Sequence, residues 1–187
     1  MIAIIGILSA VLLPNAFKQI EKSKCARTEE DIATIKTAAL QHYADTAVWP
    51  PSNWGDDSGN ELYWRYHPPA SRSAGAGFIE NAFQGTDPKH DDWDGPYMEG
   101  WKRNPWGILY YWDFNANDQN GDGVGDEHVV WIDNARGRPS RSKRIPYNSR
   151  IKIDRDIDDG DLTSGFLQVW QGAPRTGNFG MIVIQGQ

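Results

Sequence analysis

The residues best suited to chemistry form an Asn-, Asp- and Gly-rich stretch between Asp113 and Glu127. Oxygen-bearing side chains alternate there in the spacing of a calcium-binding loop, whose first, third, fifth and ninth positions supply side-chain ligands and whose seventh supplies a carbonyl. The residues at these positions are Asp118, Asn120, Asp122, Asp126 and Val124. Gly123 stands sixth, where the loop turns sharply. Because alternate hard oxygen ligands converge inside such a turn, the pattern predicts bound Ca²⁺.

This loop is not an EF-hand, and a solvated turn is the alternative interpretation. Its twelfth position is Val129 instead of a bidentate Glu, and its flanks have the composition of strands. Turns rich in Asn, Asp and Gly are common without a metal. Crowded carboxylates repel one another without a cation, however, so calcium is favoured. Asp113, Asn115 and Glu127 are candidates for additional ligands.

A second acidic run lies at residues 154–161, where Asp154, Asp156, Asp158 and Asp161 give a similar alternation. Its glycine is displaced by one position and Arg155 lies inside it. We therefore favour an acidic surface loop and leave a second calcium site open. The basic residues that precede this run are Arg136, Arg138, Arg141, Lys143, Arg144, Arg150 and Lys152. We interpret them as a solvated loop whose charges pair with the acidic run or with an adjacent subunit.

Composition and motifs argue against several functional classes. The net charge is −6 and the pI is near 5.1, which is the wrong sign for a nucleic-acid-binding protein. The histidines (His42, His67, His90 and His128) have no zinc-like spacing, and no nucleophile, phosphate-loop or dinucleotide motif occurs. The lone cysteine, Cys25, excludes an internal disulfide and suits packing on a helix face. We expect a structural protein, not an enzyme.

The elements that position these residues begin with a long helix. The stretch from Met1 to Leu13 is apolar and uncharged, but shorter than the roughly 20 residues that span a membrane. From Asn15 to Val48, apolar residues recur mainly at three- and four-residue steps, namely Phe17, Ile20, Ile32, Ile35, Ala39 and Tyr43. Pro50 should end the helix, and Pro14 should break or loosen it. The chain therefore divides into an apolar segment (1–14), an amphipathic continuation (15–48) and a globular region (49–187).

The globular region has the pattern of a small sheet. Candidate strands rich in β-branched and aromatic residues lie at residues 108–113, 128–133, 166–170 and 181–185, and residues 78–83 are a candidate short helix. The predicted fold class is α+β, with the long N-terminal helix packed on a small antiparallel sheet that has long loops.

The apolar start, AIIGILSAVLLP at residues 3–14, resembles the N-terminal segment of type IV pilins and pseudopilins. That family's mature chain begins upstream with an N-methylated Phe and carries a Glu near its start. Neither residue is present here, so the resemblance implies that Met1 is internal or a wrongly assigned start. A signal peptide or signal anchor is the alternative, although no basic residue precedes the apolar run. The implied assembly residues are Ile2, Ile5, Gly6, Leu8, Leu12, Pro14, Phe17 and Ile20.

A second resemblance lies in mid-chain. Gly95-Pro96-Tyr97, followed by Pro105-Trp106-Gly107 and an aromatic strand, is similar to the pattern of G-type major pseudopilins of type II secretion. Asn104 replaces the usual Asp but keeps a side-chain acceptor for the turn. That family binds structural calcium in a late loop between strands.

The two resemblances imply a structural subunit of an extracytoplasmic helical filament, either a pseudopilus or a surface pilus. Such a subunit forms homo-oligomers, meets an inner-membrane assembly machinery, and is held in the membrane before assembly into a periplasmic or cell-surface filament. The alternative is a membrane-anchored or secreted calcium-dependent carbohydrate-binding module.

Overall fold

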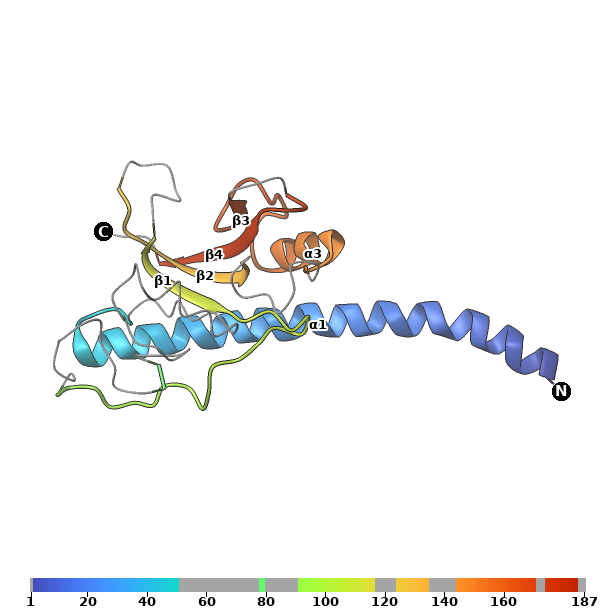
Figure 1. Cartoon of the computed structure of the whole chain (residues 1–187), viewed down its shortest axis with the longest axis horizontal. Helices are drawn as coiled ribbons and strands as arrows, with labels where there is room; N and C mark the ends of the chain where they lie inside the picture. Colours follow the sequence, from blue (N-terminus) through green and yellow to red (C-terminus); the bar gives the residue numbers. More distant parts are fainter. Residues whose placement is uncertain are drawn as a thin grey trace, which may run out of the picture.

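The structure is a computed structural model that describes residues 2–50, 78–79, 91–116, 124–134, 144–170 and 174–184. Its elements are α1 (Ile2–Thr46), β1 (Tyr111–Ala116), β2 (Glu127–Asp133), α3 (Tyr147–Ile157), β3 (Leu167–Trp170) and β4 (Asn178–Ile184). Figure 1 shows α1 passing along one face of the sheet and extending well beyond it at the N-terminal end. The predicted α+β class is confirmed.

The buried side of α1 follows the period of an amphipathic helix. Positions separated alternately by three and four residues are buried, with Asp31 and Ala38 buried beside them: Cys25, Thr28, Ile32, Ile35, Ala39, His42 and Thr46. This spacing keeps one stripe of the helix against the sheet. The stripe starts later than the sequence predicts, because Phe17 and Ile20 are 64% and 50% exposed.

The predicted break at Pro14 is wrong, since α1 is continuous from Ile2 to Thr46. Proline removes one backbone hydrogen bond and crowds the preceding turn, which bends a helix without ending it when helix-forming residues continue on both sides. The helix ends two residues before the predicted boundary. Ala47 adopts a left-handed φ of 56° there, and the backbone N–H of Val48 donates to the Thr46 hydroxyl (3.3 Å).

The four strands form one antiparallel sheet in the order β1-β2-β4-β3. All four predicted strands are present, with shifted ends. Trp131 of β2 pairs with Gly180 of β4, and a Cβ at Gly180 would lie 2.9 Å from the Trp131 ring. The glycine therefore makes room for the indole.

Both faces of the sheet are covered. Alternate residues of β2 point to opposite sides, as a strand requires. Val130 and Ile132 join the main core with the α1 stripe, whereas Val129 and Trp131 pack in a second cluster with Leu109, Tyr111 and Ile182. Because β2 is buried on both faces, it is the centre of the fold.

Helix α3 covers residues 147–157, so the predicted loop is wrong for the end of the basic stretch and the first part of the acidic run, whereas residues 158–161 lie outside the helix. Ile153 is buried in the main core, and Ile151 and Ile157 pack against it. Pro146 directly precedes the first turn, where its fixed φ suits a helix start. Of the candidate helix at residues 78–83, the structure describes only residues 78 and 79, which lie in a turn.

Candidate functional site

The part of α1 that precedes the buried stripe is the first candidate site. Residues 15–20 are all exposed, and they include the apolar Phe17 and Ile20. The other proposed assembly positions (Ile2, Ile5, Gly6, Leu8, Leu12 and Pro14) all lie within the helix, and their side chains are outside the described residues. None of the described helices combines the length and apolarity that crossing a membrane requires.

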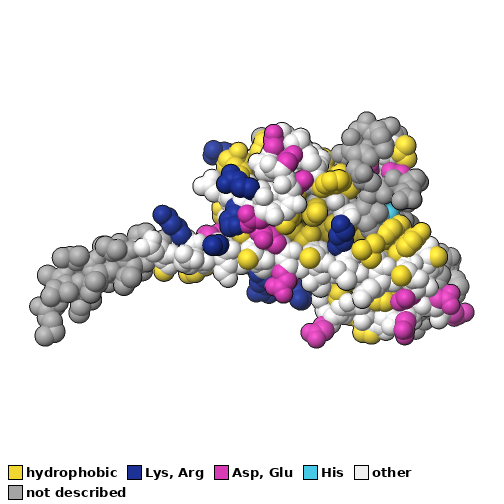
Figure 2. All heavy atoms as spheres, turned by 180° about the vertical axis from the view of Figure 1, so that it is seen from behind, with side chains coloured by type: hydrophobic (Ala, Val, Ile, Leu, Met, Phe, Trp, Pro, Cys, Tyr) yellow, Lys and Arg dark blue, Asp and Glu magenta, His cyan; other side chains and the backbone are white. Residues whose placement is uncertain are grey.

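Lysine side chains line the part of α1 where the helix meets the globular region. Figure 2 shows basic side chains at the place where the helix leaves the rest of the molecule; Lys18 and Lys22 are exposed in this stretch. Further along, Lys24 pairs with Glu21 at 2.8 Å and lies over the Trp106 ring, 5.7 Å from its centroid. One residue of the mid-chain motif therefore contacts α1 just where the buried stripe begins.

The Asn104–Gly107 turn is organised by one buried side chain. Asn104 Oδ1 accepts hydrogen bonds from the backbone N–H groups of Trp106 and Ile108, both at 3.0 Å. Gly107 closes the turn with φ 83°, a left-handed value that glycine adopts without strain. The expectation that Asn104 caps this turn is confirmed.

Asn104 also makes a contact that an aspartate could not make. Its Nδ2 donates to the Ile132 carbonyl on β2 at 2.8 Å, and the residue is buried. Aspartate has no donor for that carbonyl at neutral pH. The amide therefore ties the turn to the central strand as well as capping it.

The Gly95-Pro96-Tyr97 segment contacts the other end of α1. The Tyr97 hydroxyl donates to Asp45 Oδ2 at 2.7 Å, and its ring packs edge-on to His42. Burial and the Asp45 hydrogen bond raise the pKa of Tyr97 to about 12. The motif residues thus join α1 to the sheet at both ends of the packed stripe, which makes them structural.

The predicted calcium loop is described only at its edges. Asp118, Asn120 and Asp122 lie outside the described residues. Asp113 is buried on β1, where its Oδ2 accepts from Trp131 Nε1 at 3.3 Å; Val124 is exposed.

Asp126, at the far edge of this loop, is half-buried. Its Oδ1 is buried and has no hydrogen-bond partner among the described residues. The β1–β2 pairing shifts register between Asp113 and Ala116, at the start of the loop. Calcium in this loop remains a prediction, and these residues present oxygen donors suited to it.

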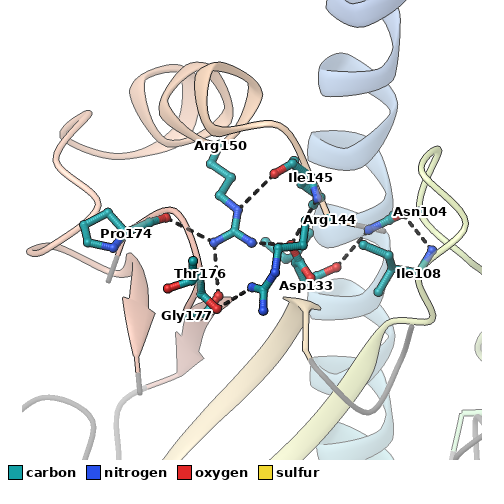
Figure 3. Close-up of polar contacts among 10 residues, drawn as sticks. Asn104, Ile108, Asp133, Arg144, Ile145, Arg150, Pro174, Thr176 and Gly177 are labelled. Carbon is teal, nitrogen blue, oxygen red and sulfur yellow. Dashed lines mark hydrogen bonds and ion pairs between the residues drawn. The ribbon is translucent and has the colours of Figure 1, made fainter. Parts of the chain in front are cut away.

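The most extensive polar centre was not predicted. Arg150 of α3 is fully buried and forms an ion pair with Asp133 at the end of β2 (Figure 3). Its guanidinium also donates to the carbonyls of Ile145, Pro174 and Gly177, and Asp133 accepts from the Ile145 N–H. Apolar residues recur at four-residue steps after Pro146, from Tyr147 to Ile151 and from Ile153 to Ile157, and this is the signal that could have revealed the helix.

Comparison with known proteins gives one match. A family model described as PilW, C-terminal, matches residues 19–125. The matched range includes the packed stripe of α1, both mid-chain motif segments and most of the predicted calcium loop. No curated protein and no solved structure matches the chain significantly.

Proposed function

The chain belongs to the PilW C-terminal family, which is associated with type IV pilus biogenesis, and from this premise we propose that it is a structural subunit of a helical filament. In this proposal α1 is the assembly element and the sheet domain forms the filament's outer part. The role is structural and not catalytic. Copies of the same chain are its principal partners, together with an inner-membrane assembly machinery.

The projection of α1 carries this proposal. The helix has 45 residues and so is about 68 Å long, whereas its buried stripe starts only at Cys25. The sequence before that point is predominantly apolar, and Phe17 and Ile20 are exposed. A long helix with exposed apolar residues at its projecting end gains stability by packing against other helices.

The attachment of the helix supports an assembly role. Tyr97 binds the C-terminal part of α1, and Trp106 packs beside its middle, so the helix and the sheet domain are joined by several separate contacts. A rigid joint lets helix packing set the position of the outer domain. The mid-chain motif that makes these contacts favours the G-type pseudopilin lineage over a generic pilin.

The same features support a proposed location for the subunit before and after assembly. In this proposal the apolar start of α1 holds the subunit in the inner membrane before assembly, and afterwards the subunit is part of a periplasmic or cell-surface filament. Ca²⁺ bound by the loop around Asp118, Asn120 and Asp122 stabilises the outer domain.

Polymer formation by the full chain tests the proposal. The chain is purified in detergent, the detergent is removed, and the product is examined by sedimentation and negative-stain electron microscopy. We expect regular fibres, and we expect Ile20→Glu to abolish them, because it places a charge in the helix-packing region.

Leu40→Glu is the matched control, since Leu40 is 45% exposed on the same helix but lies beside the sheet domain. We expect this variant to form fibres. Monomers or amorphous aggregates from the unmodified chain would contradict the proposal. Monomers whose Trp fluorescence changes with an added glycan and Ca²⁺ would instead favour a carbohydrate-binding module.

A further inference from the structure

The end of α3 and the loop that follows it gather carboxylates in one place. Asp154, Asp158 and Asp159 each offer an oxygen, and these oxygens all lie within 4.8 Å of one another. Two oxygens bound to one Ca²⁺ at about 2.4 Å can be at most about 4.8 Å apart. The cluster is therefore compact enough for its members to share one ion.

Asp154 sets this cluster apart from an ordinary acidic surface. Its side chain is 0% exposed, and neither carboxylate oxygen has a hydrogen-bond partner in the part of the chain that the structure describes. Buried carboxylates are normally paired, hydrogen-bonded or bound to a metal. An unpartnered one that points at two further carboxylates indicates that a cation belongs there.

The loop after α3 holds the other two carboxylates in position. Asp158 Oδ2 accepts from the Leu167 N–H at 2.8 Å, and Asp159 accepts from the Asp161 N–H (2.7 Å) and the Ser164 hydroxyl (2.8 Å). Gly165 makes this closure possible: a Cβ there would lie 2.2 Å from Asp158 Oδ2. The sequence thus leaves the space that the carboxylate needs.

Two neighbouring basic side chains are paired elsewhere, and a third, Arg155, is exposed. Arg150 pairs with Asp133, and Lys152 pairs with Asp156 on the exposed side of α3. Burial and the charges of Asp159, Asp158 and Asp161 raise the pKa of Asp154 to about 7. The C-terminal end of a helix adds partial negative charge to the same place. The neighbouring carboxylates and the helix end both make the electrostatic potential at this cluster favourable to a cation.

We propose that Asp154, Asp158 and Asp159 bind one Ca²⁺ that fastens the end of α3 to the start of β3. Carboxylates without His or Cys select a hard cation, which excludes zinc as the preferred ion. A loop that combines side chains with open positions for water suits the irregular coordination of Ca²⁺ better than the strict octahedron of Mg²⁺. This site is separate from the loop between β1 and β2.

Calcium titration of the full chain in detergent tests this assignment. Asp118→Asn/Asp122→Asn serves as the background, so that the other predicted site does not contribute. Isothermal titration calorimetry should show one bound Ca²⁺, and thermal unfolding should shift upward with Ca²⁺. Adding Asp154→Asn or Asp158→Asn should weaken this binding roughly tenfold or more, because one of three charged ligands is lost.

Asp156→Asn is the matched control, because Asp156 lies on the same helix and outside the cluster; its calcium affinity should be unchanged. In EDTA, Asp154→Asn should melt at a higher temperature than its background, since it removes an uncompensated buried charge. The assignment is overturned if Asp154→Asn and Asp158→Asn keep the background's calcium affinity, or if Mg²⁺ gives an equal shift at equal concentration. Neither readout requires filaments, so this result is independent of the polymerisation test.

Discussion

Two fully buried carboxylates near α3 have opposite surroundings. Asp133 accepts from the Arg150 guanidinium and from the Ile145 N–H, and Arg150 is itself held by three backbone carbonyls (Figure 3). Asp154, one helical turn after Arg150, has no hydrogen-bond partner among the described residues and faces other carboxylates. The same helix therefore carries one completed polar centre and one that lacks its counter-charge.

The difference distinguishes a structural ion pair from a ligand site. A buried ion pair offsets its desolvation only when its remaining donors and acceptors are also satisfied, and the Asp133–Arg150 pair meets that condition. A buried carboxylate without a partner costs free energy, and Asp154 has none among the described residues. A bound cation would supply the missing charge.

The largest expected loss of stability comes from breaking the buried Asp133–Arg150 ion pair. Arg150→Met leaves Asp133 buried and unpaired, and should lower the free energy of unfolding by about 3–5 kcal/mol. Urea unfolding, followed by Trp fluorescence, measures this loss. Lys152→Met removes the exposed pair with Asp156 on the same helix and should cost only about 0.5 kcal/mol. Similar losses in the two variants would mean that burial does not determine how much an ion pair contributes to the free energy of unfolding.

An intermediate loss of stability is expected at low pH, when the buried, neutral His128 is protonated. Burial lowers the pKa of His128 from 6.5 to about 4, and its ring lies between Trp49 and Trp112. The unfolded chain therefore binds this proton at a higher pH than the folded chain, so stability is full above pH 6.5 and falls as the pH drops toward 4. The loss should be about 1–2 kcal/mol by pH 5.

His128→Gln should reduce this part of the pH dependence. Urea midpoints measured between pH 4.5 and 7.5 give the slope for both chains, and their difference at pH 7.5 reports the packing cost of the substitution separately. Parallel slopes for the variant and the unmodified chain would show that His128 does not titrate in this range.

The smallest of these three effects on stability comes from removing one hydrogen-bond donor. Asn104→Asp keeps the acceptor for the Trp106 and Ile108 N–H groups but loses the donor to the Ile132 carbonyl. We expect a loss of about 1 kcal/mol in urea unfolding at pH 7. Because residue 104 is not among the proposed calcium ligands, Ca²⁺ should not restore the stability of this variant. A restoration would show that the variant carboxylate has become a ligand.

Local patterns were sufficient for much of the fold. The three- and four-residue spacing predicted α1, and the β-branched and aromatic runs predicted all four strands, because both signals arise from which face of an element is buried. Asn104 was predicted as a turn cap for the same local reason. Helix α3 was missed because charged residues, Arg150 and Asp154 among them, interrupt its apolar residues, and its isoleucines do not follow one regular helical stripe.

The sequence by itself determined the helix, the strands, the motif turn and the positions of both acidic runs, since these depend on neighbours within a few residues. Only the tertiary structure decided which charges are buried and what each one faces. Arg150 and Asp154 look equivalent in a charged run, yet one meets Asp133, 17 residues away in the chain, and the other meets only carboxylates. The free energy of a buried charge depends on its partners and on its burial, and folding decides both. Asp133 reaches Arg150 from β2, whereas the carboxylates near Asp154 are close in the chain and matter because folding buries Asp154.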